Sequence, residues 1–396
     1  MPEKRAWRKQ QEIGIGMVKA RENRIDLIRG LSLLLIFVGH SSFSFSEGLQ
    51  HSRGFADASE LFVLMAGISA ALAYYPRGGA LDFPSLAAKP LRRAGKIYAV
   101  HVALLVGLVG LFSVGLAKDL PIFAQASAIL GLTGFWSDPL GNLASIFLLR
   151  YMPGNFDILP MYVILIACVP LFLYLNDRAP KLLICGSLLV WLGAGFGHVN
   201  FVNTALPEGH WYFDPLSWQL IFLIGLVIGV RLKTGRPALP YNRALFIAAA
   251  AFCVLAVPAN ILFHFHFIEP PSEWLYRAMT SKTNDGILRL VNAIAIVYVL
   301  WNIEAVRRLA DGSFLQPICV IGRHSMPVFI TGLLLSDLMT VSMGLPRSLT
   351  LPEQILLMTA GVLLQLVVGQ YLEARKNCTS LSRSHPAPAE AKGATR

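Results

Sequence analysis

Two ionisable residues stand out in an apolar stretch that runs from Asp26 to His40, DLIRGLSLLLIFVGH. Arg29 and His40 are eleven residues apart, which in an α-helix is three turns plus about 20°. Both side chains should therefore share one helix face, about 16 Å apart along the axis. Ionisable groups inside a membrane helix usually face a cavity or a partner. Arg29 could instead be a topology-setting arginine at the cytoplasmic edge, and His40 a packing histidine.

Two carboxylates open the next apolar run. Asp57 and Glu60 are spaced i and i+3, and this spacing places them on one helical face near the depth of His40. An imidazole with a carboxylate partner is a base of fixed tautomer that takes a proton near neutral pH. We therefore predict that His40 is a general base, with Asp57 or Glu60 as its partner. Asp57 can also cap the helix, and Glu60 can favour the helix dipole.

A group of cations follows at the inner surface, with the spacing i, i+3, i+4 and i+7 that marks one helix face: Lys89, Arg92, Arg93 and Lys96. Such a face could bind phosphate groups through charge-assisted hydrogen bonds, or it could contact anionic lipids. Arg323 and His324, in the segment IGRHSMP, form a second candidate for phosphate binding.

Aromatic and polar residues gather in the predicted outer segment 197–218. Ring faces combined with polar tips suit a sugar, although an aromatic belt at the membrane interface would look similar. The candidate sugar-binding residues are Trp211, Asp214, Trp218 and Gln219, with Asp157, Lys282 and Arg289 as weaker candidates. We predict no metal site, because His264 and His266 at i, i+2 do not share a helix face.

The composition indicates a polytopic helical membrane protein. The chain has 396 residues, of which 55% are hydrophobic and only 14% are charged, far below the charge of a soluble protein. Apolar runs long enough to cross a bilayer recur along it. We predict an all-α fold of about ten transmembrane helices at 27–45, 59–75, 97–117, 158–175, 181–196, 216–230, 244–262, 286–303, 318–340 and 353–373.

The positive charges predict the orientation of these helices. With the N-terminus inside, the inner segments hold 26 of the 34 lysines and arginines and the outer segments hold 7, so both termini should be cytoplasmic. The net charge of +11 is spread over short loops, which argues against nucleic-acid binding. We divide the chain into a basic segment (1–26), a membrane domain (27–373) and a disordered tail (374–396).

Five segments, in their order, resemble the OpgC family of membrane glucan succinyltransferases, within the acyltransferase-3-like enzymes: DLIRGLSLLLIFVGH, FADASELFVLMAGISAALAYY, DILPMYVILI, FDPLSWQLIFLIGL and IGRHSMPVF. The resemblance runs from about Arg24 to Glu373. It implies a ten-helix fold, a cytoplasmic acyl-CoA donor, an outer acceptor hydroxyl, His40 as the base and Arg29 at the donor. The candidate phosphate-binding cations named above would then bind coenzyme A of the donor, and the candidate sugar-binding residues would bind the acceptor. The family has asparagine at the position of Asp214, which leaves the role of Asp214 open.

We therefore expect an O-acyltransferase of the bacterial inner membrane. It would move an acyl group, with succinyl as one option, from acyl-CoA to a glucan or other saccharide. It would need no permanently bound cofactor, and its partners would be the lipid bilayer, acyl-CoA and the saccharide. The sequence leaves open whether the protein forms a homo-oligomer. The alternative is a proton-coupled transporter using the same buried His, Asp and Glu groups, although no internal repeat is evident.

Overall fold

The computed structural model describes residues 21–76, 82–197, 199–345 and 349–384, and these ranges fold almost entirely into α-helices. This confirms the all-α class. The main helices are α2 (Asn23–His40), α4 (Ala58–Tyr74), α5 (Phe83–Ala117), α8 (Ile158–Arg178), α9 (Pro180–Gly197), α10 (Pro215–Lys233), α11 (Arg243–His264), α13 (Ile287–Asn302), α15 (Gln316–Arg323), α16 (Ser325–Gly344) and α17 (Leu351–Ser384).

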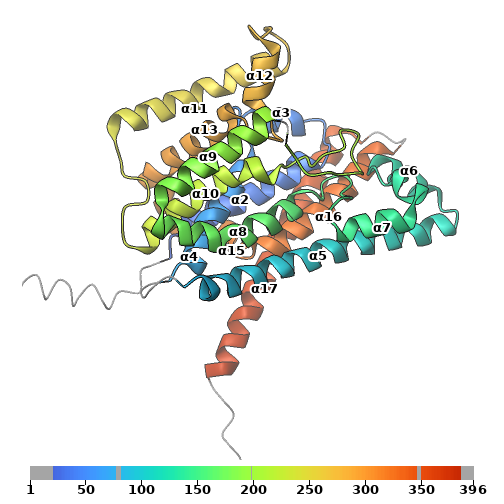
Figure 1. The fold of residues 1–396 in the computed structure, drawn as a ribbon. Helices are drawn as coiled ribbons and strands as arrows, with labels where there is room; N and C mark the ends of the chain where they lie inside the picture. The colour runs from blue at the N-terminus through green and yellow to red at the C-terminus, as the bar shows by residue number, and fades with distance from the viewer. Residues whose placement is uncertain (1–20, 77–81, 198, 346–348, 385–396) are drawn as a thin grey trace, which may run out of the picture.

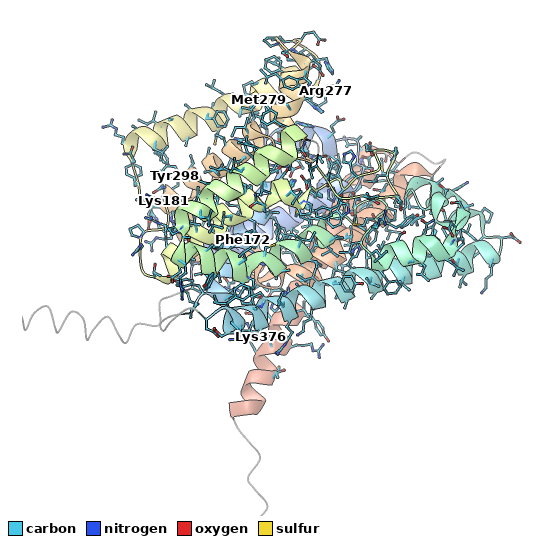
Figure 2. All side chains as sticks on the ribbon, viewed as in Figure 1. Phe172, Lys181, Arg277, Met279, Tyr298 and Lys376 are labelled. Carbon is cyan, nitrogen blue, oxygen red and sulfur yellow. The ribbon has the colours of Figure 1, made fainter. Side chains whose placement is uncertain are left out.

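Shorter helices join them: α3 (Ser46–His51), α6 (Pro121–Ile129), the 3₁₀ helix η1 (Thr133–Ser137), α7 (Pro139–Phe147), α12 (Glu273–Thr280) and α14 (Glu304–Asp311). Figure 1 shows α6 and α7 together at one end of the long helix α5. Figure 2 shows Arg277 and Met279 on α12 projecting beyond the bundle at the top of the view, while Phe172 on α8 lies over its middle.

Seven helices in the described ranges are long and apolar enough to cross a membrane: α5, α8, α9, α10, α11, α16 and α17. A bent pair, α13 and α14, whose axes meet at 75°, can make an eighth. All ten predicted spans coincide with helices, but α4 has only 17 residues and α2 carries Arg24, Asp26 and Arg29. The number of ten transmembrane helices and the cytoplasmic location of both termini remain predictions.

The predicted span 318–340 is wrong as one continuous helix. It breaks at His324, where α15 ends at Arg323 and α16 begins at Ser325. The break places Ser325 beside Arg29 of α2, and the two side chains are hydrogen-bonded. The last helix also runs past its predicted edge at 373, because α17 continues to Ser384. The rest of the predicted tail, 385–396, and most of the basic segment, 1–20, lie outside the described residues.

Small residues bring α2 and α15 into backbone contact. A Cβ atom on Gly30 would lie 2.1 Å from the carbonyl oxygen of Ile318, and one on Gly322 would lie 2.0 Å from that of Asp26. Neither position tolerates a side chain, so glycine permits this close approach, as in many packed membrane helices. The approach fixes α2, which carries both Arg29 and His40, against α15.

Peripheral helices expose apolar side chains. Leu189 on α9 is 69% exposed, Val254 on α11 is 70% exposed and Leu356 on α17 is 69% exposed. Large exposed apolar surfaces mark contact with a partner or with lipid, and these helices are long enough to span a bilayer. The chain is therefore a multi-pass membrane protein whose outer helices face lipid.

Candidate active site

A largely apolar cavity of about 210 Å³ lies beside Arg29. Its walls come from α2, α4, α5, α8 and α16, and they include the rings of Phe62, Tyr162 and Phe329. Two cations line it, Arg29 from α2 and Arg93 from the first turns of α5. The cavity therefore combines an apolar interior with guanidinium groups, a pairing that suits a ligand with one anionic end and one apolar end.

Hydroxyl groups from two other helices hold the guanidinium of Arg29. Its Nη1 donates to the Ser69 hydroxyl of α4 at 3.3 Å, and its Nη2 donates to the hydroxyl of Ser325. Its Nε is buried and has no partner among the described residues. Buried donors normally make a hydrogen bond, so this N–H can donate one to a ligand. A topological arginine would reach toward water instead.

The other predicted donor-binding residues lie elsewhere. Lys89, Arg92 and Lys96 are exposed on α5, and Arg93 alone of that group lines the cavity. Arg323 and His324 are not part of its lining. Arg323 pairs with Asp26 at 3.4 Å and with Glu373 at 3.3 Å, and His324 pairs with Glu373 at 2.8 Å. These pairs tie α2, α15 and α17 together, which favours a structural role.

His40 is half-buried and lines two small cavities further along α2. Each holds about 10 Å³, room for about one water molecule. One is apolar and includes Phe37, Phe329 and Ser336. The other is polar and includes Gln50 of α3, Asp57 and Lys282.

These spaces form a series along α2. Phe329 borders both the Arg29 cavity and the apolar cavity at His40. His40 in turn borders both the apolar and the polar small cavities. The ring of Phe329 stacks on Phe62 with centroids 6.3 Å apart. Phe329 is thus part of the walls of both the Arg29 cavity and the apolar cavity, and His40 is part of the walls of both small cavities.

A buried charge cluster stands behind the polar cavity. Lys282 lies 2.6 Å from the Oδ2 oxygen of Asp57, and the Nη2 of Arg289 lies 3.2 Å from the same oxygen. Arg289 also contacts the Oε1 oxygen of Glu60 at 2.6 Å. Asp57 and Glu60 are 5% and 0% exposed. Two cations therefore neutralise two carboxylates, and this offsets the free-energy cost of burying the charges.

The carboxylates also cap α4, as anticipated for Asp57. The Asp57 side chain accepts the backbone N–H of Ser59 at 2.7 Å, and Glu60 accepts the N–H of Asp57 at 2.9 Å. Burial opposes the charge of Asp57, but Lys282 and Arg289 hold the pKa of this carboxyl well below its usual range. Asp57 is therefore a carboxylate at neutral pH.

The predicted pairing of His40 with Asp57 or Glu60 needs revision. In the described ranges the imidazole bonds to neither carboxylate, because both are taken up by the two cations and by the helix cap. Glu60 lines none of the three cavities described above. Asp57 does share the polar cavity with His40, together with Lys282. The arrangement is a histidine facing an ion pair.

Comparison with known proteins decides the family. The family model described as OpgC protein matches residues 21–377. The chain belongs to the OpgC family. A comparison with curated proteins finds no significant match. Membership of the OpgC family supports a membrane-bound, glucan-modifying acyltransferase, in agreement with the resemblance seen in the sequence.

The outer aromatic residues of this OpgC protein do not offer open ring faces. Trp211 and Trp218 are 2% and 0% exposed. The indole of Trp211 donates to the carbonyl of Val202 at 3.1 Å. That of Trp218 donates to the carbonyls of Lys282 and Thr283 at 3.0 and 3.2 Å. This placement does not support stacking of a sugar on these rings. Trp218 instead positions the loop that carries Lys282.

The remaining acceptor candidates are also buried. Asp214 is 0% exposed and caps α10, accepting from the N–H of Leu216 at 3.0 Å and the hydroxyl of Ser217 at 2.8 Å. Gln219 exchanges hydrogen bonds with Ser187 of α9. Asp157 is 4% exposed, just before α8. These three stay outside the described cavities, whereas Lys282 lines one of them.

Sequence reasoning missed several residues that line the cavities or bind Arg29: Gln50, Ser69, Tyr162, Ser325 and Phe329. Gln50 donates to Asp57 at 2.9 Å. Most are small or apolar residues within helices, where nothing local separates a cavity wall from ordinary packing. Ser325 had one usable signal, because it directly follows Arg323 and His324.

Proposed function

We propose that this OpgC protein is an O-acyltransferase of the bacterial inner membrane. It moves an acyl group from cytoplasmic acyl-CoA to a hydroxyl group of a glucan or other saccharide on the outer side. The single observation that supports this best is the series of cavities along α2, with Arg29 at one end and His40 at the other. A donor that enters at one membrane face could meet an acceptor from the opposite face at His40.

The Arg29 cavity would receive the donor. Arg29 and Arg93 can bind phosphate oxygens or the amide carbonyls of the pantetheine arm. The apolar walls suit the methylene groups of that arm. The exposed cations Lys89, Arg92 and Lys96 on the same turns of α5 extend the positive surface outward. The thioester must then pass Phe329 to reach His40.

His40 would act as the general base. The acceptor hydroxyl gives its proton to the imidazole as its oxygen attacks the thioester carbonyl carbon. A C–O bond forms, the C–S bond breaks, and the departing thiolate takes the proton from the imidazolium. The products are an ester and free coenzyme A, and the histidine is restored.

Lys282 would assist at the carbonyl oxygen. Burial opposes the charge of Lys282, but Asp57 raises the pKa of its ammonium group, so it remains a cation. A fixed cation beside the reacting carbonyl stabilises the negative charge that develops there. Asp57 would thus orient Lys282 directly and serve His40 through it. The polar cavity has room for about one water molecule, so an acceptor must part α3 from the Lys282 loop.

Proteoliposomes that contain the purified full-length protein provide the test. Acyl-CoA carrying a radiolabelled acyl group is trapped inside, with succinyl-CoA and acetyl-CoA compared, and a soluble glucan is added outside. We expect label in an alkali-labile ester on the glucan, in proportion to protein. Label that stays on coenzyme A with every donor, or that crosses the membrane as an unesterified small molecule, would refute the proposal and favour transport.

A further inference from the structure

Three potential metal ligands meet beside α3, and they are not among the residues that line the described cavities. Glu47 and His51 lie one helical turn apart on α3, and His264 is the last residue of α11. One ligand atom from each lies within 4.8 Å of the others. The Nε2 nitrogen of His264 is 3.1 Å from the Oε1 oxygen of Glu47. Two helices far apart in the sequence thus bring two imidazoles and a carboxylate together.

This donor set suits a divalent transition metal. Zinc takes imidazole nitrogen and carboxylate oxygen at about 2.0–2.2 Å, and tetrahedral geometry then places neighbouring ligand atoms about 3.4 Å apart. The separation of 3.1 Å between His264 and Glu47 is close to that spacing. The remaining separations, up to 4.8 Å, need only a modest inward turn of side chains at the surface. Three protein ligands would leave one position for water.

The surroundings hold His51 in place. The amide nitrogen of Asn260, a residue 4% exposed, lies 2.9 Å from the Nδ1 nitrogen of His51 and donates to the carbonyl of Gly54 at 2.6 Å. This hydrogen bond orients the imidazole of His51 beside Glu47 and His264.

The two imidazole rings stack with their centroids 3.6 Å apart. A metal ion lies in the plane of each imidazole that binds it, so the inward turn of these side chains would also separate the two stacked rings.

We propose that Glu47, His51 and His264 bind a divalent transition-metal ion such as Zn²⁺, which links α3 to α11. The sequence pair His264 and His266 does not form the site, because His266 lies instead against Glu269 at 3.7 Å. The missing partners come from α3. That helix also carries Gln50, which donates to Asp57 at 2.9 Å. A bound ion would therefore fix one wall of the polar cavity.

The test measures metal binding alone, so its outcome is independent of the acyltransferase proposal. The full-length protein is purified in detergent without a polyhistidine tag, stripped with a chelator and titrated with Zn²⁺. Bound zinc is measured after desalting, and the thermal midpoint is recorded with and without Zn²⁺. The test variants are His264→Ala and Glu47→Gln, which change surface side chains. His266→Ala is the matched control, because it removes a histidine only two residues further along the chain.

We expect about one saturable Zn²⁺ per chain and a higher thermal midpoint with zinc for the wild type and the His266→Ala control. Each test variant should lose at least about tenfold in affinity, since even partners of metal ligands contribute 10–100-fold. Both should also lose the thermal shift. The proposal is overturned if no stoichiometric ion is retained, or if His264→Ala binds zinc as tightly as the wild type does.

Discussion

At the scale of single residues, the carboxylates beside His40 have different tasks. Asp57 shares the polar cavity with His40 and Lys282. Glu60 is fully buried against Arg289 and caps the N–H of Asp57. The sequence could not separate the two, because Lys282 and Arg289 lie more than 200 residues downstream. Local spacing places both carboxylates on one turn, and only tertiary packing supplies their partners.

Glu60→Gln should therefore mainly lower the stability of the folded protein. The change leaves Arg289 buried without its main counter-ion, which costs about 3–5 kcal/mol when one member of a buried pair is removed. We expect a clear fall in the thermal midpoint of the purified protein. Replacing both residues, as in Glu60→Gln with Arg289→Met, should recover much of the loss. A single variant as stable as the wild type would contradict this structural role.

Asp57→Asn should mainly lower the rate of turnover. Asparagine can still cap α4, but it cannot hold the charge of Lys282. We expect a fall in kcat for acyl transfer at nearly unchanged KM for acyl-CoA, and little further loss when Lys282→Met is added, because the two act as one unit. Independent, multiplying losses in the double variant would show that Asp57 does not work through Lys282.

Arg29→Ala should weaken donor use. Hydrogen bonds to charged groups contribute about 1.5–3 kcal/mol, so the KM for acyl-CoA should rise by about 10- to 100-fold. The KM for the glucan should change little. Lys89→Ala, which removes an exposed cation near the same cavity, is the control and should have a much smaller effect. An unchanged KM for acyl-CoA in Arg29→Ala would leave the arginine with a purely structural or topological role.

At the scale of helices, the period of 3.6 residues was enough to place Arg29 and His40 along one side of α2, and both line the series of cavities. The break at His324 was missed, although Pro327 was a usable signal. Proline has no N–H to donate to the carbonyl of Arg323 four residues earlier, and this favours an interruption there. Arg323 and His324 at the break pair with Asp26 of α2 and Glu373 of α17.

Phe329 of α16 is the residue to test at this scale. It lines both the Arg29 cavity and the small cavity at His40. Phe329→Ala should merge the two spaces and lower selectivity between short and long acyl-CoA donors. It should also cost about 3–5 kcal/mol of stability as a core truncation. Phe329→Leu, which keeps more volume, should alter selectivity with a smaller stability loss. Unchanged donor preference in both variants would show that donors take another path.

At the scale of the whole molecule, composition alone predicted a helical membrane protein, and the all-α fold confirms its class. The distribution of lysine and arginine predicts which end of the bundle faces the cytoplasm. Figure 2 shows Lys376 on the part of α17 that extends beyond the bundle at the bottom of the view. The neighbouring Cys378 is exposed and is a natural probe of sidedness.

A variant that keeps Cys378 as its sole cysteine should resist a membrane-impermeant maleimide in intact spheroplasts and react after lysis. The matched control adds Glu269→Cys to a cysteine-free chain, in the loop between α11 and α12, where it should react without lysis. The positive-inside distribution underlies both expectations. Labelling of Cys378 in intact spheroplasts would place the C-terminus outside and reverse the direction of transfer.

The central claim is that His40 removes the proton from the acceptor hydroxyl, and His40→Gln tests it most directly. Glutamine keeps hydrogen-bonding capacity and similar volume but cannot take up a proton. The variant should insert and melt like the wild type and bind acyl-CoA with normal affinity. Its rate of transfer to the glucan should fall by about 10²–10⁴, the usual contribution of a general base. Transfer at the wild-type rate by well-folded His40→Gln would contradict the account and leave His40 as a packing residue.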